Sequence, residues 1–176
     1  LMTYKGSLSM SRPAKALVTG SKGQLGTALC GTFDATPVDV DELDITNSDS
    51  VSSFDTGDAE AIINAAAYTA VDQAEDNREV TFAVNSIGVK NLADLANLKN
   101  LPLVHYSTEY VFSGKGEIPW QENDEYEPLN VYGYSKAKGD KRVANVGGKW
   151  LIFRPIWVYD YDGKNFLTTF LKLANT

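Results

Sequence analysis

VTGSKGQLGTAL, residues 18–29, decides the fold class, because it joins an apolar strand to a helix through a turn that holds three glycines. The strand is predicted over 14–20, AKALVTG, a short apolar run rich in strand formers that ends in glycine. The residues that follow the turn, 27–33, are predicted as a helix. A strand, a tight turn and a helix in this order are typical of the start of an α/β fold.

The spacing of the glycines indicates a phosphate site. Gly20, Gly23 and Gly26 form G-x-x-G-x-x-G, where many dinucleotide-binding proteins have G-x-G-x-x-G. Glycines suit such a turn because the chain bends sharply and its backbone must approach a pyrophosphate. The free N–H groups at the helix start then bind the anion. The turn therefore predicts dinucleotide binding, with a glycine-rich turn that binds nothing as the alternative.

Apolar runs alternate with helical stretches along the rest of the chain. Further strands are predicted at 36–45, 59–67, 101–108 and 150–159. A long helix is predicted over 80–98, with an apolar side formed by Val84, Ile87, Leu92, Leu95 and Leu98. This alternation predicts a Rossmann-type, doubly wound parallel sheet with the spatial strand order 3-2-1-4-5. A polar loop over 113–130 interrupts the pattern, and loops of that length are often functional.

Composition limits the classes of function. A chain of 176 residues is long enough for one domain with a core. Its net charge of −7 and pI near 4.7 argue against a nucleic-acid or anionic-membrane surface, and no apolar run approaches the roughly 20 residues of a membrane span. Cys30 is the only cysteine and cannot form an internal disulfide, so a cytoplasmic protein is expected. Residues 1–13 are expected to be a disordered or engineered lead-in.

YGYSKAK, residues 132–138, contains two tyrosines, each followed four residues later by a lysine. On a helix such pairs share a face, and an ammonium beside a phenol lowers the pKa of the phenol, which makes the tyrosine a candidate proton donor. The helical stripe that holds Tyr132 and Lys136 is otherwise small or apolar, whereas Tyr134 and Lys138 belong to a cationic face. Tyr132 and Lys136 are therefore predicted to point inward.

Five motifs occur in order at fitting distances: TGSKGQLG (19–26), NAAAYTAVDQAED (64–76), HYSTEYVFSGKG (105–116), PLNVYGYSKAKGD (128–140) and LIFRPIWVY (151–159). With them the chain resembles the extended short-chain dehydrogenase/reductases, and most closely the dTDP-4-dehydrorhamnose reductases. The resemblance implies reduction of dTDP-4-dehydro-L-rhamnose to dTDP-L-rhamnose with NADPH or NADH. Two alternatives remain. One is another nucleotide-sugar reductase or epimerase, and the other is a non-catalytic regulator similar to the beta subunit of methionine adenosyltransferase.

The resemblance also implies chemical roles. Tyr132 resembles the family's proton donor to the sugar C4 oxygen, with hydride arriving from the nicotinamide. Lys136 would lower the pKa of this tyrosine and bond the nicotinamide ribose. Thr108 matches the hydroxyl that bonds the substrate carbonyl, and Glu109 stands where the family usually has aspartate. Asn85 matches an asparagine that supports the active site in related reductases, with a helix-surface amide as the alternative.

Other positions match the family's binding residues. On the cofactor side these are Gly20, Gly23, Gln24, Leu25, Gly26, Asp39, Asp44, Ile45, Ala67, Tyr68, Thr69, Tyr106, Tyr132 and Lys136. On the nucleotide-sugar side they are Thr108, Glu109 and Trp157. Asp39 follows a predicted strand, where a carboxylate can accept from the adenosine ribose, with a solvated loop carboxylate as the alternative. Asp39 favours NADH whereas Lys22 is suited to the 2′-phosphate of NADPH, so the preference stays open. No metal site is implied.

The end of the sequence carries the last expectation. NFLTTFLKLANT, 165–176, has the pattern of an amphipathic helix, and members of the resembled family continue past this point into a region that closes over the nucleotide-sugar. Residues 14–176 are therefore expected to be an NAD(P)-binding domain truncated before the substrate-binding region, with weak dinucleotide binding and poor turnover. An exposed apolar patch near Trp157 and Phe166 is expected to favour self-association, and a homodimer is the oligomer considered.

Overall fold

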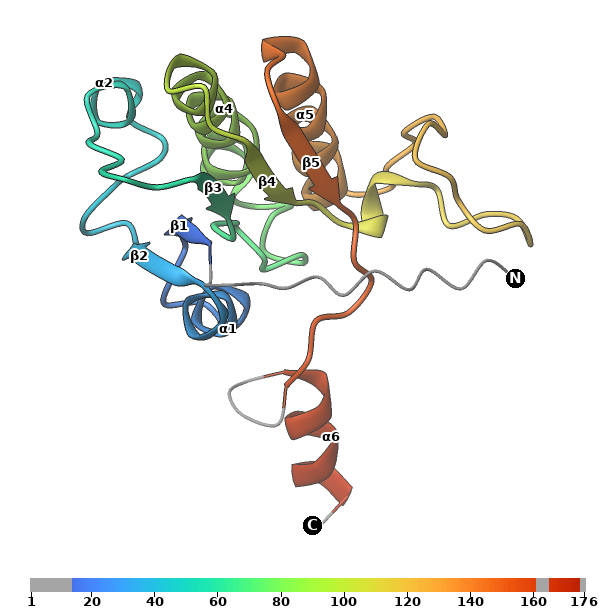
Figure 1. Ribbon diagram of the computed structural model, residues 1–176. Helices are drawn as coiled ribbons and strands as arrows, with labels where there is room; N and C mark the ends of the chain where they lie inside the picture. The colour runs from blue at the N-terminus through green and yellow to red at the C-terminus, as the bar shows by residue number, and fades with distance from the viewer. Residues whose placement is uncertain (1–13, 161–164, 175–176) are drawn as a thin grey trace, which may run out of the picture.

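The computed structural model describes residues 14–160 and 165–174, and at its centre lies a parallel sheet of five strands (Figure 1). The strands are β1 Lys15–Thr19, β2 Asp34–Val38, β3 Ala61–Asn64, β4 Leu103–Tyr106 and β5 Trp150–Phe153. Every pair of neighbouring strands runs parallel, with Leu17 of β1 opposite Ile62 of β3, for example. The lead-in expected at 1–13 lies outside the described residues.

Helices cover both faces of this sheet. The helical elements are α1 Gln24–Thr32, α2 Ser48–Ser52, α3 Arg78–Phe82, the π-helical turn η1 Ala83–Gly88, α4 Val89–Leu98, the 3-10 turn η2 Glu109–Val111, α5 Val131–Val146 and α6 Phe166–Ala174. Successive residues of a strand point to opposite faces. Accordingly, Leu17 packs in one core cluster with Leu92 of α4, whereas Val18 packs in another with Leu29 of α1. The predicted doubly wound, Rossmann-type fold is therefore confirmed.

The predicted strand order 3-2-1-4-5 is wrong, because the observed order is β2-β1-β3-β4-β5. The third strand pairs with β1 on the side opposite β2, so it is central where the prediction placed it at an edge. The physical reason lies in the two sequences. Ile62 and Ile63 of β3 are both buried, which requires cover on both faces. The outer strand β2 is largely exposed and carries Pro37, a residue that sheets confine mainly to their edges.

All five strands are shorter than predicted, and the second and the fifth show why. The segment predicted as a strand over 36–45 leaves the sheet after Val38, and its acidic end forms turns instead. The last strand ends at Phe153, two residues before Pro155, and β5 is an edge strand. Both ends lie at the carboxyl edge of the sheet, where the sequence becomes polar or carries proline.

The long helix predicted over 80–98 is interrupted by the π-helical turn η1. A π-turn inserts an extra residue into the helical repeat and rotates the helix that follows. Leu92 and Leu95 are buried as predicted, whereas Ile87 and Leu98 are 44% and 71% exposed, so these two do not belong to the buried face. Uniform helical periodicity cannot anticipate such a shift.

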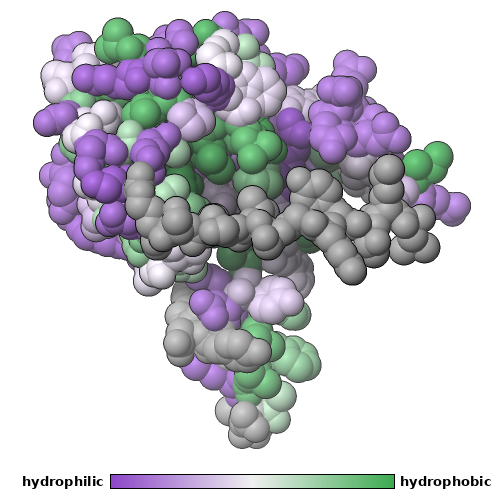
Figure 2. Space-filling model, viewed as in Figure 1, coloured by the Kyte–Doolittle hydropathy of each residue, from purple (hydrophilic) through white to green (hydrophobic). Residues whose placement is uncertain are grey.

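The helix α6 lies apart from the sheet at the carboxyl end of the described chain (Figure 1). No residue of α6 is buried, and Figure 2 shows apolar side chains on its surface. Asn165, which precedes the helix, is buried. Trp157 and Phe166 are each 57% exposed and contact one another, with ring centroids 4.5 Å apart. The exposed apolar patch predicted near these two residues is confirmed. Within the described part of the chain, no helix has the length and apolar character that a membrane crossing needs.

Candidate active site

The glycine turn lies at the carboxyl end of β1, between β1 and α1, as predicted. Gly20 has a φ of +69°, a left-handed conformation in which a side chain is strained, and a Cβ there would lie 2.6 Å from the backbone of Ala66. At Gly26 a Cβ would lie 2.1 Å from the carbonyl oxygen of Gly20. Backbone atoms of the turn therefore contact backbone atoms at the start of α1 and just after β3, with no side chain between them. This close packing brings the first turn of α1 to the edge of the sheet.

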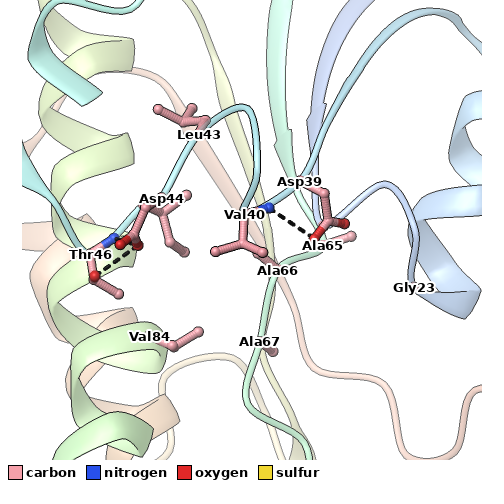
Figure 3. A pocket seen from close by; sticks show the side chains of 12 residues that line it. Gly23, Asp39, Val40, Leu43, Asp44, Thr46, Ala65, Ala66, Ala67 and Val84 are labelled. Carbon is pink, nitrogen blue, oxygen red and sulfur yellow. Dashed lines mark hydrogen bonds between the residues drawn. The ribbon is translucent and has the colours of Figure 1, made fainter. Parts of the chain in front are cut away.

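A cavity of about 280 Å³ opens beside this turn (Figure 3). It lies beside the residues that follow β1, β2 and β3. The chain passes from β1 to β2 on one side and to β3 on the other, and doubly wound sheets bind ligands at such a point. Its lining consists of Gly20, Gly23, Asp39, Val40, Leu43, Asp44, Ile45, Thr46, Ala65, Ala66, Ala67 and Val84. The structure thus brings together six of the predicted cofactor residues: Gly20, Gly23, Asp39, Asp44, Ile45 and Ala67.

Asp39 is a fixed carboxylate at one side of this cavity. Its Oδ2 accepts from the backbone N–H of Lys22 at 2.9 Å, and its Oδ1 accepts from the N–H of Val40 at 2.9 Å. Partial burial raises the pKa of Asp39, but these two hydrogen bonds outweigh burial and the net pKa is lowered. The ammonium of Lys22 pairs with Asp41 at 2.6 Å. The cavity therefore presents an ionised carboxylate, while its nearby lysine is engaged by another acid.

The start of α1 has the features of an anion site. The helix begins after Gly23 without a side-chain cap, so its first N–H groups lack intrahelical partners. Gln24, at the first helical position, has a buried side-chain nitrogen for which the described residues provide no hydrogen-bond partner. Leu25 is half-buried and packs beneath the turn, in the cluster on the α1 face. These observations fit a bound pyrophosphate.

The loop that follows β3 is held by a buried asparagine. Asn85 of η1 accepts from the N–H of Tyr68 at 2.8 Å and donates to its carbonyl at 3.0 Å. The same amide donates to the hydroxyl of Ser135 at 3.0 Å, so it links this loop to α5. Asn85 is fully buried, and the alternative of a helix-surface amide is therefore wrong. Thr69 lies exposed on the loop that Asn85 fixes.

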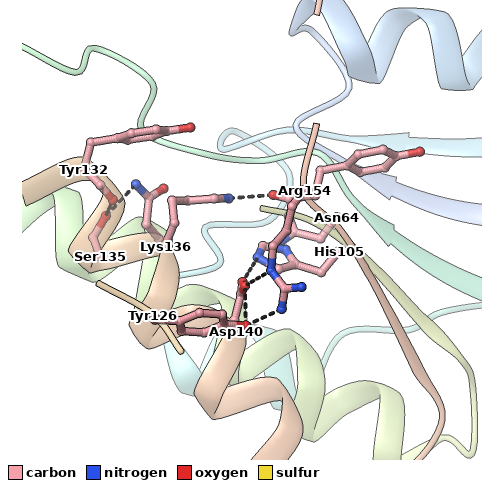
Figure 4. Close-up of polar contacts among 10 residues, drawn as sticks. Asn64, His105, Tyr126, Tyr132, Ser135, Lys136, Asp140 and Arg154 are labelled. Carbon is pink, nitrogen blue, oxygen red and sulfur yellow. Dashed lines mark hydrogen bonds and ion pairs between the residues drawn. The ribbon is translucent and has the colours of Figure 1, made fainter. Parts of the chain in front are cut away.

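Tyr132 and Lys136 extend from the inward side of α5 in the same direction (Figure 4). Asn130 caps this helix by accepting from the N–H of Gly133 at 2.7 Å, which sets the phase of the helix from its first turn. Lys136 is 1% exposed, whereas Tyr134 is 47% exposed. The helix phase predicted from the sequence is confirmed, and the first tyrosine–lysine pair is the inward one.

The ammonium of Lys136 donates to the carbonyl oxygen of Tyr106 at 2.6 Å, at the end of β4. Burial lowers the pKa of Lys136 to about 8, and the charge of Asp140 opposes this effect. The pKa of Tyr132 is raised, with burial as the largest cause and a hydrogen bond with Thr108 opposing it. The net pKa is raised although Lys136 is predicted to lower it, because burial is the largest cause, and the effect of Lys136 itself stays a prediction. A phenol whose pKa is raised is fully protonated near neutral pH, as a proton donor must be.

The predicted nucleotide-sugar residues separate into two groups. Thr108 and Glu109 follow β4 directly, and the Thr108 hydroxyl lies 3.0 Å from Oε2 of Glu109. Thr108 is buried and shares a hydrogen bond with Tyr132. Trp157 lies on the exposed segment after β5 and packs on Phe166. The structure thus brings Thr108 and Tyr132 together, whereas Trp157 is 57% exposed and is not a core residue.

Residues 14–176 match the family described as the RmlD substrate binding domain. The chain belongs to this family. One relative is the dTDP-4-dehydrorhamnose reductase of Aggregatibacter actinomycetemcomitans. It is 42% identical to this chain over 168 residues, which are 92% of this chain and 57% of that protein. The dTDP-4-dehydrorhamnose reductase of Salmonella typhimurium is 50% identical over 115 residues, 65% of this chain and 38% of that protein.

Solved structures give the same relation. The crystal structure of dTDP-4-dehydrorhamnose reductase from Bacillus anthracis in complex with NADP has a TM-score of 0.86 and 36% identity, covering 93% of this chain and 60% of that one. The reductase from Clostridium acetobutylicum also gives 0.86, with 38% identity, covering 92% and 59% of the two chains. The RmlD-family chain thus spans about half the length of the relatives it matches.

Sequence reasoning missed a polar network next to Tyr132 and Lys136 (Figure 4). Its members come from five separate segments: Asn64, His105, Ser107, Tyr126, Asp140 and Arg154. One signal was present, because Asp140 follows Lys136 by four residues and so continues the inward stripe of α5. The other members are distant in sequence, and only the fold places them together.

Proposed function

We propose that the protein reduces dTDP-4-dehydro-L-rhamnose to dTDP-L-rhamnose with NADPH or NADH. The observation that carries the proposal is the inward pair Tyr132 and Lys136, with Thr108 near enough to the tyrosine to act on its pKa. A buried phenol, a buried ammonium and a short hydroxyl at one strand end suit proton transfer to a carbonyl oxygen. Relatives named for this reaction match 92% of the chain, which supports the choice of substrate.

The residues present fit a dinucleotide. The turn is so close at Gly20 and Gly26 that no Cβ can be accommodated, and the buried amide nitrogen of Gln24 has no described partner at the start of α1. Both features suit a pyrophosphate at the helix N-terminus. Asp39 lines the cavity, and its carboxylate suits the hydroxyls of the adenosine ribose. The relative from Bacillus anthracis was crystallised with NADP, which supports a nicotinamide cofactor.

When bound, the reduced nicotinamide supplies a hydride to the carbonyl carbon. Tyr132 then donates its phenolic proton to the oxygen of that carbonyl, so that the ketone becomes an alcohol. Thr108 orients the oxygen through a hydrogen bond from its hydroxyl. Lys136 supplies a positive charge that stabilises the tyrosinate left behind. Because these groups are buried, the carbonyl oxygen of the substrate is shielded from water, and this shielding strengthens each of these interactions.

We further propose that residues 14–176 supply the dinucleotide site and the proton donor, while most of the nucleotide-sugar contacts lie in a region corresponding to the unmatched part of the relatives. The support is that the chain accounts for 57% of the Aggregatibacter protein.

We also propose a cytoplasmic location, supported by Cys30 as the only cysteine. Cell fractionation tests the location, and a membrane-bound or secreted protein would contradict it.

The test of function is the oxidation of NADPH and NADH, followed at 340 nm, by the protein as its gene encodes it. The substrate is dTDP-4-dehydro-L-rhamnose, and dTDP-glucose is the control because it has no 4-keto group. We expect turnover with the keto-sugar and formation of dTDP-L-rhamnose. Consumption of the keto-sugar without cofactor oxidation would indicate an epimerase. Cofactor binding without turnover of any keto-sugar would indicate a regulator and contradict the proposal.

A further inference from the structure

Two charged residues are buried beneath the active site, and they lie one helical turn apart on α5. Lys136 and Asp140 are each 1% exposed, and within residues 14–160 and 165–174 no other lysine, arginine, aspartate or glutamate is buried. Residues separated by four positions on a helix share a face, with Cβ atoms about 6 Å apart. Burial of one unpaired charge is costly, whereas opposite charges in one interior stabilise each other.

Asp140 is bonded by groups from two other segments. Its Oδ2 accepts from Nε of Arg154, after β5, and from the hydroxyl of Tyr126, in the polar loop, both at 3.1 Å. A second guanidinium nitrogen of Arg154 bonds the Tyr126 hydroxyl. Burial raises the pKa of Asp140, and the neighbouring Ser107 hydroxyl and the charges of Arg154 and Lys136 offset this rise only in part. The guanidinium and the phenol that donate to Oδ2 favour the ionised form of the carboxylate.

The histidine that faces Asp140 is neutral. The side-chain oxygen of Asn64 accepts from Thr19 at 2.8 Å and from the N–H of Ala66 at 3.0 Å, so its amide nitrogen is the atom that faces Nδ1 of His105, at 3.0 Å. Nδ1 is therefore an acceptor, and Nε2 carries the proton. Nε2 lies 3.7 Å from Oδ1 of Asp140. Burial lowers the pKa of His105 well below its usual value, so it contributes an N–H dipole and no charge.

Among the described residues, Asp140 is the only buried carboxylate, and it is the anionic side chain that acts on Lys136. On α5 the charge that acts on Lys136 is that of Asp140, and on β4 its neighbours are the neutral His105 and the carbonyl of Tyr106. Among the other groups of this region, Arg154 and Tyr126 bond Asp140, the uncharged Asn85 bonds Ser135, and Glu109 acts on Tyr132. Without Asp140, the buried Lys136 and the partly buried Arg154 would be two cations with no buried anion among the described residues.

We propose, building on the proposed reductase function, that Asp140 is a positioning residue. Its carboxylate keeps the ammonium of Lys136 charged and held at the carbonyl of Tyr106, so that Tyr132 faces a cation when it gives up its proton. Through Arg154 and Tyr126 the same carboxylate also ties the catalytic helix to the polar loop and to the segment after β5. Asp140 itself touches neither substrate nor cofactor.

The test is a direct titration of Lys136. The protein as encoded is labelled with lysine carrying ¹³C at Cε, and the resonance of Lys136 is assigned by its loss in Lys136→Met. Asp140→Asn keeps the shape of the side chain and removes its charge, and should lower the titration midpoint by about one pH unit. Tyr126→Phe is the matched control, because it removes one hydrogen bond to the same carboxylate and keeps the charge. Its midpoint should stay within about 0.3 of the wild-type value.

Turnover supplies the second measurement. If Lys136 must be charged, the alkaline limb of the kcat profile should move to lower pH in Asp140→Asn, and Asp140→Glu should restore at least half of the shift. A purely structural role would lower kcat equally at every pH and leave the midpoint unchanged. A folded Asp140→Asn protein with an unchanged midpoint overturns the proposal.

Asp140→Asn leaves Arg154 without its carboxylate, and this variant can unfold for that reason alone. The double variant Asp140→Asn/Arg154→Met removes both charges and avoids this defect. Its Lys136 midpoint should lie below that of Arg154→Met alone, since these two variants differ only in the charge of Asp140, and equal midpoints in the two folded variants likewise overturn the proposal. Lack of turnover in the wild-type protein would refute the proposed function, whereas the ¹³C midpoints decide the role of Asp140 without any substrate.

Discussion

Gly26→Ala tests whether the close approach of α1 to the glycine turn creates the dinucleotide site. The added Cβ would lie 2.1 Å from the carbonyl oxygen of Gly20 and 2.8 Å from two further backbone atoms, one of them Cα of Ser21. Real Cβ contacts essentially never fall below 3.0 Å, so α1 must shift by at least 0.9 Å. The neighbours are backbone atoms, which cannot rotate away as a side chain does.

The size of the effect follows from that shift. Overpacking of this kind costs roughly 1–3 kcal/mol of folding stability, which a domain of ordinary stability survives. The first N–H groups of α1 move with the helix. Loss of one hydrogen bond to a charged phosphate costs about 1.5–3 kcal/mol, so the Kd for NADH or NADPH should rise roughly 10- to 100-fold.

Gly31→Ala is the matched control on the same helix, because a Cβ at Gly31 meets nothing within 4 Å. It should leave cofactor affinity unchanged and raise stability by about 0.5–1 kcal/mol, as alanine does in an exposed helix. Urea unfolding followed by tryptophan fluorescence measures the stability, and the quenching or enhancement of reduced-cofactor fluorescence measures the Kd. If Gly26→Ala matches the wild type in both, or if Gly31→Ala weakens binding equally, the reasoning is refuted.

Three further predictions concern the same site. In Lys136, burial lowers the pKa to about 8 from 10.5, so the unfolded chain binds more protons between these values. The unfolding free energy of wild type relative to Lys136→Met should therefore rise by up to roughly 3 kcal/mol from pH 8 to 10.5, and parallel urea midpoints across this range would exclude it. Gly139→Ala places a Cβ 2.3 Å from the carbonyl of Asn85 and should destabilise the fold by about 1–3 kcal/mol, which an unchanged urea midpoint would contradict. Asp39→Asn removes an ionised carboxylate that repels a 2′-phosphate, and should raise the affinity for NADPH relative to NADH by about tenfold; an unchanged ratio in fluorescence titrations would exclude this role.

Local signals in the sequence were reliable where one segment determines its own structure. The three glycines located the turn at the end of β1, and the stripe of Tyr132 and Lys136 gave the correct inward face of α5. The order of the strands depends instead on which side of β1 the third strand pairs. Right-handed crossovers permit either side. The burial of Ile62 and Ile63 and the proline in β2 settle the question once they are compared.

Other features could not be predicted because they depend on contacts between distant segments. Ile87 lies in the π-helical turn η1 and is exposed, and no residue pattern marks this turn. Leu98 is exposed at the last position of α4. The network around Asp140 joins β3, β4, the polar loop, α5 and the segment after β5. The direction of the pKa shift of Tyr132 also depends on burial by the surrounding fold, which the spacing to Lys136 does not reveal.

The most direct test of the central claim compares Tyr132→Phe with Tyr134→Phe in the protein as encoded. The two tyrosines lie two residues apart on one helix, and Tyr134 is 47% exposed. Steady-state oxidation of reduced cofactor with dTDP-4-dehydro-L-rhamnose should fall roughly 10²-fold or more in Tyr132→Phe, with dinucleotide affinity nearly unchanged. Tyr134→Phe should remain within about twofold of wild type, as expected for an exposed side chain. Inactivation by Tyr134→Phe together with full activity of Tyr132→Phe would contradict the assignment of Tyr132 as the proton donor.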